Sequence, residues 1–228
     1  MRIPKLTALL FDVDGLLVDT EEIYYGTFNE TLVAHGAGLV REGYAPYVGH
    51  PVEDNSRSAA AQYALSVSAE AFCGEWMGRF EDTLADPAQI HLMPGVLEVV
   101  THVRTRGYRL GLVSSTPKER MLTTVRNGLL SRLDGVASLE EVFSAILSRS
   151  DVVNPKPAPE AYLLAAQRLG VAPEQCAVFE DSEPGVRAGK AAGMFVFAVP
   201  NFYTSHQDHS AADVTLGSLA EILTEGYL

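Results

Sequence analysis

The sequence of 228 residues contains only two cysteines and has no excess of positive charge. Cys73 and Cys176 are far apart and lack the spacing of a metal site, so we expect neither a disulfide framework nor a zinc site. The formal net charge of −12 at pH 7 argues against a broad basic surface for a nucleic-acid backbone. We therefore predict no nucleic-acid partner, although a local basic pocket for a small anion is compatible with this composition.

Long apolar runs are also missing. No stretch approaches the ~18 uninterrupted apolar residues that a membrane-spanning helix requires, and the first residues show no secretory signal pattern. A hydrophobic content of 47% with 20% charged residues is typical of a globular protein. These features predict a soluble cytoplasmic protein without membrane contact. The sequence does not distinguish a monomer from a weak homodimer.

The most informative stretch is residues 9–20, which read LLFDVDGLLVDT. The apolar run before Asp12 predicts a short buried strand, and Asp12 and Asp14 follow at a spacing of two. Side chains at this spacing in an extended segment project to the same side, so the two carboxylates should meet. Such a pair needs a shared proton or a cation, and Mg²⁺ prefers oxygen ligands of this kind. A solvated turn is the alternative reading, because Asp and Gly15 are common in turns.

The part of the chain that follows is predicted to be all-helical over residues 18–88. Thr20, with two glutamates in the next turn, is a suitable helix N-cap. Phe72, Trp76 and Phe80 lie at a strict spacing of four, which predicts the apolar face of a further helix capped by Ser68.

Beyond residue 89 the pattern changes to short apolar strands that alternate with helices. The expected strands cover residues 108–113, 142–147, 176–179, 194–199 and 213–216. This alternation predicts an α/β fold with a Rossmann-like, doubly wound parallel sheet, to which the strand before Asp12 also belongs. We therefore predict an α/β catalytic core from residues 1–17 and 89–228, with an all-helical cap domain of residues 18–88 inserted into it.

Polar clusters come after the apolar segments of this predicted core. They consist of Asp12 and Asp14, of Ser114 and Ser115, of Lys156, and of Glu180 and Asp181. Ligands of such sheets bind beyond the carboxyl ends of the strands, so these side chains should meet there. Carboxylates suit a hard cation, a hydroxyl and an ammonium suit phosphate, and an aspartate can act as a nucleophile.

This order of motifs resembles the haloacid dehalogenase superfamily of phosphohydrolases. The motifs are DVDG at residues 12–15, LVS at 112–114, KPAPE at 156–160 and FEDS at 179–182, and the last continues as EPGVRAGKAAGM over residues 183–194. The insertion between the first two motifs matches the subfamily with a helical cap. That subfamily includes phosphoglycolate phosphatase, sugar-phosphate phosphatases and β-phosphoglucomutase.

The resemblance implies a Mg²⁺-dependent phosphatase that hydrolyses a small phosphorylated metabolite, such as a sugar phosphate. Asp12 would attack phosphorus to form an aspartyl-phosphate, and Asp14 would act first as an acid and then as a base. Ser114 and Lys156 would hold the phosphoryl group, and Ser115 is a less favoured phosphate ligand than Ser114.

The resemblance also implies the metal ligands. Mg²⁺ would be held by the Asp12 carboxylate, the backbone carbonyl of Asp14 and the Asp181 carboxylate. Glu180 would lie nearby or act through a water molecule.

Three residues of the predicted cap are candidates for contact with the leaving group. They are Glu21, His50 and Arg79, and each has an ordinary reading as a solvated or helix-stabilising side chain. The segment His206-Gln207-Asp208-His209 contains residues that can bind a metal ion, but its position in a polar stretch favours a solvated loop.

Two other functions stay open. A phosphomutase of the β-phosphoglucomutase type would carry a histidine where this chain has Tyr24 and an arginine in the first cap loop, whereas residues 49–56 contain no arginine. A non-catalytic binding protein on the same scaffold is the other alternative, because a fold does not guarantee activity. The complete set of charged motif residues argues against it.

Overall fold

The computed structural model describes residues 3–228, and these residues form two compact units. The core unit contains residues 3–19 and His91–Leu228, and the helical unit contains Thr20–Ile90. Both transitions between the units lie two residues further along the chain than the sequence predicted. No helix within residues 3–228 is both long enough and apolar enough to span a membrane.

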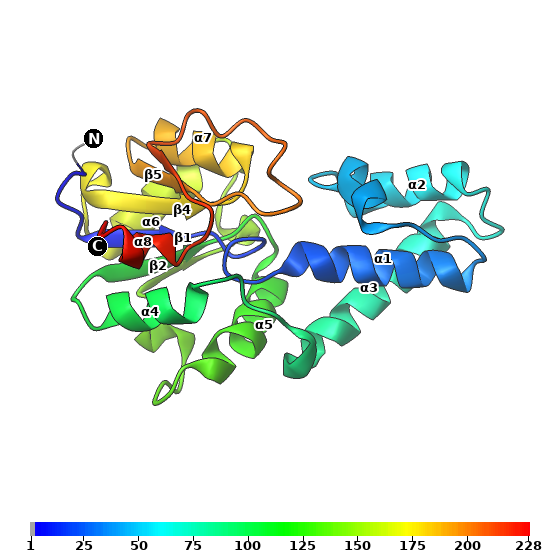
Figure 1. The fold of residues 1–228 in the computed structure, drawn as a ribbon, viewed down its shortest axis with the longest axis horizontal. Helices are drawn as coiled ribbons and strands as arrows, with labels where there is room; N and C mark the ends of the chain where they lie inside the picture. The colour runs from blue at the N-terminus through cyan, green and yellow to red at the C-terminus, as the bar shows by residue number, and fades with distance from the viewer. Residues whose placement is uncertain (1–2) are drawn as a thin grey trace. The chain divides into compact units, whose positions relative to one another are not determined.

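Six parallel strands form the centre of the core unit, in the order β3-β2-β1-β4-β5-β6 (Figure 1). The strands are β1 (Ala8–Phe11), β2 (Arg109–Val113), β3 (Ala145–Leu147), β4 (Cys176–Glu180), β5 (Phe195–Ala198) and β6 (Val214–Thr215). The predicted α/β fold with a parallel sheet is confirmed. The strand predicted over residues 142–147 begins three residues later, because the Phe143 amide donates to the Leu139 carbonyl oxygen at 2.7 Å and closes a tight turn there.

Both faces of this sheet are buried, which explains why β1 is apolar without interruption. On one face Leu10 packs in a core cluster together with residues of α6 (Glu160–Leu169) and α7 (Glu183–Ala191). On the other face the rings of Phe11, Phe179 and Phe197 stack, with centroids 4.8 and 5.0 Å apart. Full burial of each such side chain contributes roughly 1.5–3 kcal/mol, so the sheet is rigidly held from both sides.

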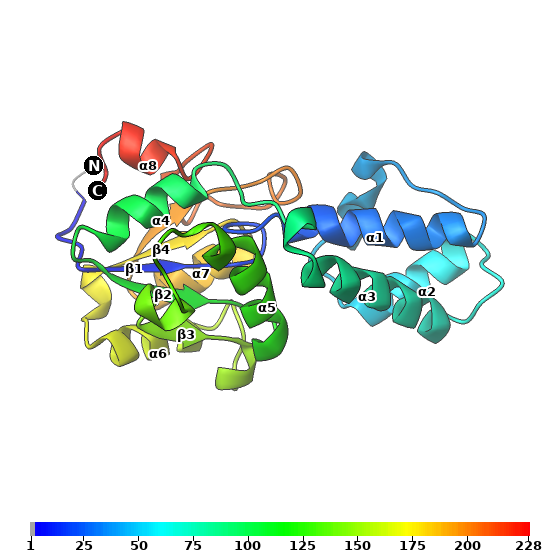
Figure 2. The same cartoon turned by 90° about the horizontal axis from the view of Figure 1, so that it is seen from below.

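The remaining helices of the core unit are α4 (Val96–Arg104), α5 (Lys118–Gly128) and α8 (Glu221–Thr224). Helices α4 and α8 lie side by side in both ribbon views (Figures 1 and 2). Gly95, at the start of α4, has φ of 85°, and a Cβ atom there would lie 2.3 Å from the Ala220 amide nitrogen. This contact therefore requires glycine on both steric and conformational grounds.

The helical unit contains α1 (Thr20–Ala34), a 3₁₀ helix (Arg41–Tyr47), α2 (Val52–Gln62), α3 (Ala69–Ala85) and a short 3₁₀ helix (Pro87–Gln89). Its interior is aromatic: the Phe28 ring contacts the rings of Phe72 and Trp76 at centroid distances of 5.5 and 4.9 Å. The predicted cap of α3 is confirmed, because the Ser68 side chain accepts from the Ala71 amide.

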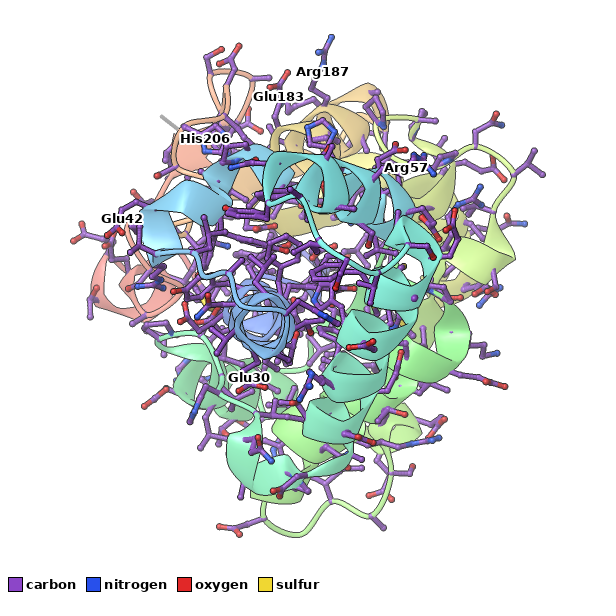
Figure 3. All side chains as sticks on the ribbon, turned by 90° about the vertical axis from the view of Figure 1, so that its right-hand side faces the viewer. Glu30, Glu42, Arg57, Glu183, Arg187 and His206 are labelled. Carbon is purple, nitrogen blue, oxygen red and sulfur yellow. The ribbon has the colours of Figure 1, made fainter. Side chains whose placement is uncertain are left out.

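The predicted cap of α1 is wrong by one position. Helix α1 begins at Thr20 itself, which places this residue inside the first turn instead of before it. Exposed side chains of the helical unit include Glu30, Glu42 and Arg57, which project from it (Figure 3).

Candidate active site

The carboxyl ends of neighbouring strands bring the predicted site residues together. The Asp12 amide donates to the Phe179 carbonyl oxygen at 3.0 Å, so the ladder between β1 and β4 extends one residue past β1. The Ser114 amide continues the pairing of β2 with β3 in the same way, at 3.0 Å from the Leu147 carbonyl oxygen. Asp12 and Ser114 are therefore fixed by the sheet and not by flexible loops.

The Lys156 ammonium lies at the centre of the cluster. Its Nζ atom donates to Asp12 Oδ1 at 2.5 Å, to Glu180 Oε1 at 2.6 Å and to the Val113 carbonyl oxygen at 2.9 Å. Burial alone would lower the pKa of Lys156, but the two carboxylates raise it above its usual value. The side chain therefore stays charged, and all three of its protons are engaged by the strand ends.

Glu180 is enclosed by groups of the chain itself. In addition to Lys156, its Oε1 accepts from the Tyr162 hydroxyl at 2.5 Å, and its Oε2 accepts from the Ser182 hydroxyl at 3.1 Å. Burial and the neighbouring carboxylates raise the pKa of Tyr162 well above its usual value, so the phenol remains a donor. A Cβ atom on Gly185 would lie 1.9 Å from the Glu180 carboxyl carbon, so helix α7 leaves room for this carboxylate only because it carries glycine there.

Asp14 points toward the end of β2. Its Oδ2 accepts from the Ser114 hydroxyl at 2.8 Å, and the Ser114 oxygen in turn accepts from the Thr116 amide at 2.9 Å. The loop that carries Asp14 turns back at once, because the Gly15 amide donates to the Val18 carbonyl oxygen at 2.8 Å. Ser114 thus holds the second aspartate in one orientation.

Asp181 is held by the segment that follows β5. The Asn201 Nδ2 donates to Asp181 Oδ2 at 2.8 Å, and His209 Nε2 lies 2.7 Å from the Asp181 carbonyl oxygen. The expected solvated loop over residues 206–209 is therefore wrong for His209, although His206 is exposed and projects outward (Figure 3). The other ring nitrogen of His209, Nδ1, lies 3.0 Å from the Gln207 carbonyl oxygen.

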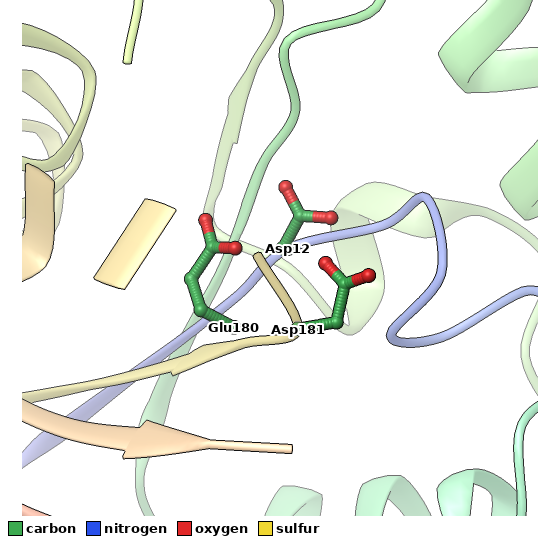
Figure 4. Close-up of side chains that lie close together, drawn as sticks. All are labelled: Asp12, Glu180 and Asp181. Atoms are coloured by element: carbon green, nitrogen blue, oxygen red, sulfur yellow. The ribbon is translucent and has the colours of Figure 1, made fainter. Parts of the chain in front are cut away.

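The carboxylates of Asp12, Glu180 and Asp181 lie close together (Figure 4). One ligand oxygen of each lies within 4.8 Å of the others, and all three residues are buried. Burial, together with the charges of Glu180 and Asp14, raises the pKa of Asp12 to about 8 in spite of the adjacent Lys156. One ammonium therefore does not balance the local negative charge, and these oxygen donors fit a divalent cation such as Mg²⁺.

The structure does not join every predicted site residue to this cluster. Ser115 is exposed, whereas Ser114 is buried. Glu21, His50 and Arg79 belong to the helical unit, where His50 and Arg79 are exposed and Glu21 is half-buried in the first turn of α1. Their roles stay predictions.

Sequence reasoning missed several residues of the site, namely Tyr162, Ser182, Asn201 and His209. In the sequence, Tyr162 looks like any residue on the apolar face of a helix, and Asn201 looks like any residue of a turn. Ser182 carried the clearest signal, since it precedes α7 and caps that helix through the Gly185 amide. The contacts of Tyr162 and Asn201 depend on tertiary packing, which no local pattern reveals.

Comparison with known proteins adds three findings. A family model described as haloacid dehalogenase-like hydrolase matches residues 9–199. The protein CbbY of Rhodobacter capsulatus is 32% identical in an alignment 228 positions long, which covers 97% of each chain. A phosphorylated carbohydrates phosphatase of Thermotoga maritima is 31% identical over 189 residues, which cover 83% of this chain and 82% of the relative.

A solved structure agrees over the same extent. The crystal structure of a CbbY variant from Rhodobacter sphaeroides in complex with xylulose-1,5-bisphosphate has a TM-score of 0.73 and 29% identity, and the match covers 95% of this chain and 96% of the other. The predicted resemblance is therefore confirmed. The chain belongs to the haloacid dehalogenase-like hydrolases and is an enzyme of their phosphatase type.

Proposed function

We propose that the protein is a Mg²⁺-dependent phosphatase that hydrolyses a small phosphorylated metabolite, in the first place a sugar phosphate, through an aspartyl-phosphate. The observation that carries this proposal is the convergence of Asp12, Asp14, Ser114 and Lys156 through direct hydrogen bonds at the carboxyl edge of the sheet. The relative named as a phosphatase of phosphorylated carbohydrates and the CbbY complex with a sugar bisphosphate support the substrate class.

In the first step an oxygen of Asp12 attacks phosphorus while the bond to the leaving alcohol breaks. Asp14 gives its proton to the departing oxygen, so the alcohol leaves neutral. The hydrogen bond from Ser114 supports this role, because it holds the Asp14 carboxyl group in one orientation. Positioning of this kind supplies much of the rate in phosphoryl transfer.

In the second step Asp14, now a carboxylate, takes a proton from a water molecule. The hydroxide attacks the phosphorus of the aspartyl-phosphate, the bond to the Asp12 oxygen breaks, and inorganic phosphate leaves. Asp14 is again protonated and Asp12 is again a carboxylate, so the cycle closes without any further reactant.

Mg²⁺ would be held by the carboxylates of Asp12 and Asp181 and by the backbone carbonyl of Asp14. Bound there, it would neutralise the phosphate charge and the crowded carboxylates. Glu180 accepts from Lys156, Tyr162 and Ser182, so we assign it to the lysine as a counterion that keeps the ammonium in place. Lys156 donates to Asp12 Oδ1, so its positive charge lies beside the proposed nucleophile and would help to neutralise a phosphoryl group bound there.

The test is phosphate release from a panel of phosphorylated sugars, organic acids and nucleotides, with Mg²⁺ or with a chelator. The proposal expects turnover of some sugar phosphates with Mg²⁺ only, and a loss of that turnover in Asp12→Asn. With a substrate whose leaving group departs without protonation, it also expects Asp14→Ala to accumulate a protein species heavier by one phosphoryl group, because the water that would hydrolyse the aspartyl-phosphate then lacks its base. Equal rates for wild type and Asp12→Asn would show that the nucleophile is another group.

A phosphomutase would give a different result on the same panel: isomerisation of a sugar 1-phosphate that depends on a bisphosphate primer. Tyr24, which stands where such mutases carry a histidine, stacks on the Phe80 ring at 4.0 Å inside the helical unit. This packing favours the phosphatase. The cytoplasmic location, the monomeric or weakly dimeric state and the lack of nucleic-acid binding stay predictions from the sequence.

A further inference from the structure

One side chain after β5 contacts two of the loops that carry the site. Asn201 Nδ2 donates to the Gly15 carbonyl oxygen at 3.0 Å and to Asp181 Oδ2 at 2.8 Å. Gly15 directly follows Asp14, whereas Asp181 follows β4. A single amide nitrogen therefore links the loop of the second aspartate to a proposed metal ligand.

The other end of the Asn201 amide is fixed as well. Its Oδ1 accepts from the Tyr203 amide at 2.8 Å and from the Thr204 amide at 3.1 Å. A primary amide has two N–H donors and a carbonyl oxygen with two lone pairs, so all four hydrogen-bonding positions are used. The amide cannot be turned over, because its oxygen would then face two acceptors and its nitrogen two donors.

The close fit at Gly15 shows how tightly these groups are packed. Gly15 has φ of 78°, a conformation that favours glycine, and a Cβ atom there would lie 2.4 Å from Asp181 Oδ2 and 2.8 Å from Asn201 Nδ2. The backbone of the first loop thus lies directly against the Asp181 carboxylate and the amide that holds it.

We propose that Asn201 is a positioning residue that fixes the rotation of the Asp181 carboxylate before Mg²⁺ binds. The inference rests on the proposed function, in which Asp181 is a metal ligand. Asp181 lies close to the carboxyl groups of Asp12 and Glu180, and any negative charge on them that is not balanced by a cation repels it. The hydrogen bond from Asn201 opposes a rotation of the Asp181 carboxylate away from Asp12 and Glu180. The conformational entropy of this carboxylate is therefore lost when the protein folds and not when the metal binds.

The contact of His209 supports the same role for the segment after β5. His209 reaches the backbone oxygen of Asp181, and the Gln207 side-chain oxygen accepts from the Glu183 amide at 2.8 Å. Both the side chain and the main chain around Asp181 are thereby held by residues 201–209.

The experiment measures Mg²⁺ binding by titration calorimetry in wild type, Asn201→Ala and Asn201→Ser. Serine can still accept from the Tyr203 and Thr204 amides, but it cannot donate to both Gly15 and Asp181, so it preserves the turn without the link. We expect the Kd for Mg²⁺ to rise about 10- to 100-fold in both variants, as is usual when a residue behind a metal ligand is removed. In kinetics, the Mg²⁺ concentration for half-maximal rate should rise in parallel, whereas kcat at saturating Mg²⁺ should change little.

The matched control is Asn29→Ala in the helical unit. Asn29 is also half-buried, and its side chain also accepts from a backbone amide, that of Leu39 at 2.8 Å. Its removal should lower Tm without changing the Kd for Mg²⁺.

Two outcomes would overturn the inference, and they differ from each other. Variants of Asn201 that bind Mg²⁺ as wild type does, with only a lower Tm like the control, would show that the residue merely stabilises the turn, while the proposed function stands. A wild-type protein that binds no Mg²⁺ would overturn both the inference and the metal in the proposed function.

Discussion

The two units of the protein place their polar side chains in opposite ways. In the core unit, the side chains of Lys156 and Glu180 are buried, and each has several hydrogen-bond partners. In the helical unit the interior is made of aromatic rings around Phe28, and the polar candidates His50 and Arg79 lie on the surface. The first arrangement fixes charges in space, and the second leaves them adaptable.

This difference between the units leads us to expect that the core unit carries out phosphoryl transfer and that the helical unit selects the substrate. Phosphoryl transfer is the same for every substrate, so its residues gain from being held rigidly by the sheet. The leaving group differs between substrates, and exposed side chains of the helical unit can vary with it at little cost to folding. Changes in the core unit should therefore affect chemistry and stability together, whereas changes at exposed positions of the helical unit should affect the choice of substrate.

The largest effect is expected for Asp12→Asn, which removes the nucleophile and leaves the shape of the side chain. Phosphate release should fall at least about 10³-fold, since loss of a nucleophile removes the covalent route altogether. The measurement is kcat on the best sugar phosphate of the panel, with Asn29→Ala as the folding control. A residual rate within tenfold of wild type would exclude Asp12 as the attacking group.

Lys156→Met should have the next largest effect, on stability as well as on activity. The substitution keeps the apolar stem but leaves the Asp12 and Glu180 carboxylates buried without their ammonium, which typically costs about 3–5 kcal/mol of unfolding free energy. Urea denaturation of the metal-free protein would measure it. Stability equal to wild type would mean that the carboxylates are protonated or solvated once the lysine is removed.

The stability of the metal-free protein should also depend on pH through Asp12. Its pKa is raised from 3.8 to about 8, so the folded state binds this proton more tightly than the unfolded state does. The contribution is fully present at low pH and is lost as the pH rises from about 4 through about 8. Urea midpoints in a chelating buffer should therefore fall across this window in wild type and fall less in Asp12→Asn.

Added Mg²⁺ should reduce the same fall, because a cation favours the carboxylate form of Asp12. Identical pH profiles for wild type and Asp12→Asn would assign the dependence to other groups. The exposed charges of the helical unit should add little to this dependence on pH.

The sheet could be predicted from the sequence because its strands are short apolar runs, and several candidate site residues could be predicted because they directly follow such a run. Asp12 and Asp14 share the spacing that places both on one side of a strand, and Ser114 directly follows an apolar run. The contacts of Asn201 and Tyr162 could not be predicted in this way. Each joins residues that are far apart in the chain, and neither side chain differs locally from an ordinary turn or helix residue.

The adjacent serines at the end of β2 offer a smaller test within the core unit. Ser114→Ala removes the hydroxyl that donates to Asp14, and kcat/KM should fall about 10²-fold, as when one fixed donor is lost from an active site. Ser115→Ala changes an exposed side chain, and kcat/KM should stay within about twofold. Equal losses in both variants would show that the loop as a whole, and not the Ser114 hydroxyl, determines activity.

The smallest effects are expected for His50→Ala and Arg79→Ala, and they test directly whether the helical unit selects the substrate. Both side chains are exposed, so the free energy of unfolding should change by less than about 0.5 kcal/mol. The kcat/KM values should change by less than about tenfold, but unequally between substrates, because a contact with the leaving group exists only in substrates that offer a partner. A panel that compares sugar mono- and bisphosphates would reveal this as a changed order of preference. An equal change in kcat/KM for every substrate would instead show that these two residues do not select the substrate. The helical unit would then contribute to selectivity through other positions or through its packing alone.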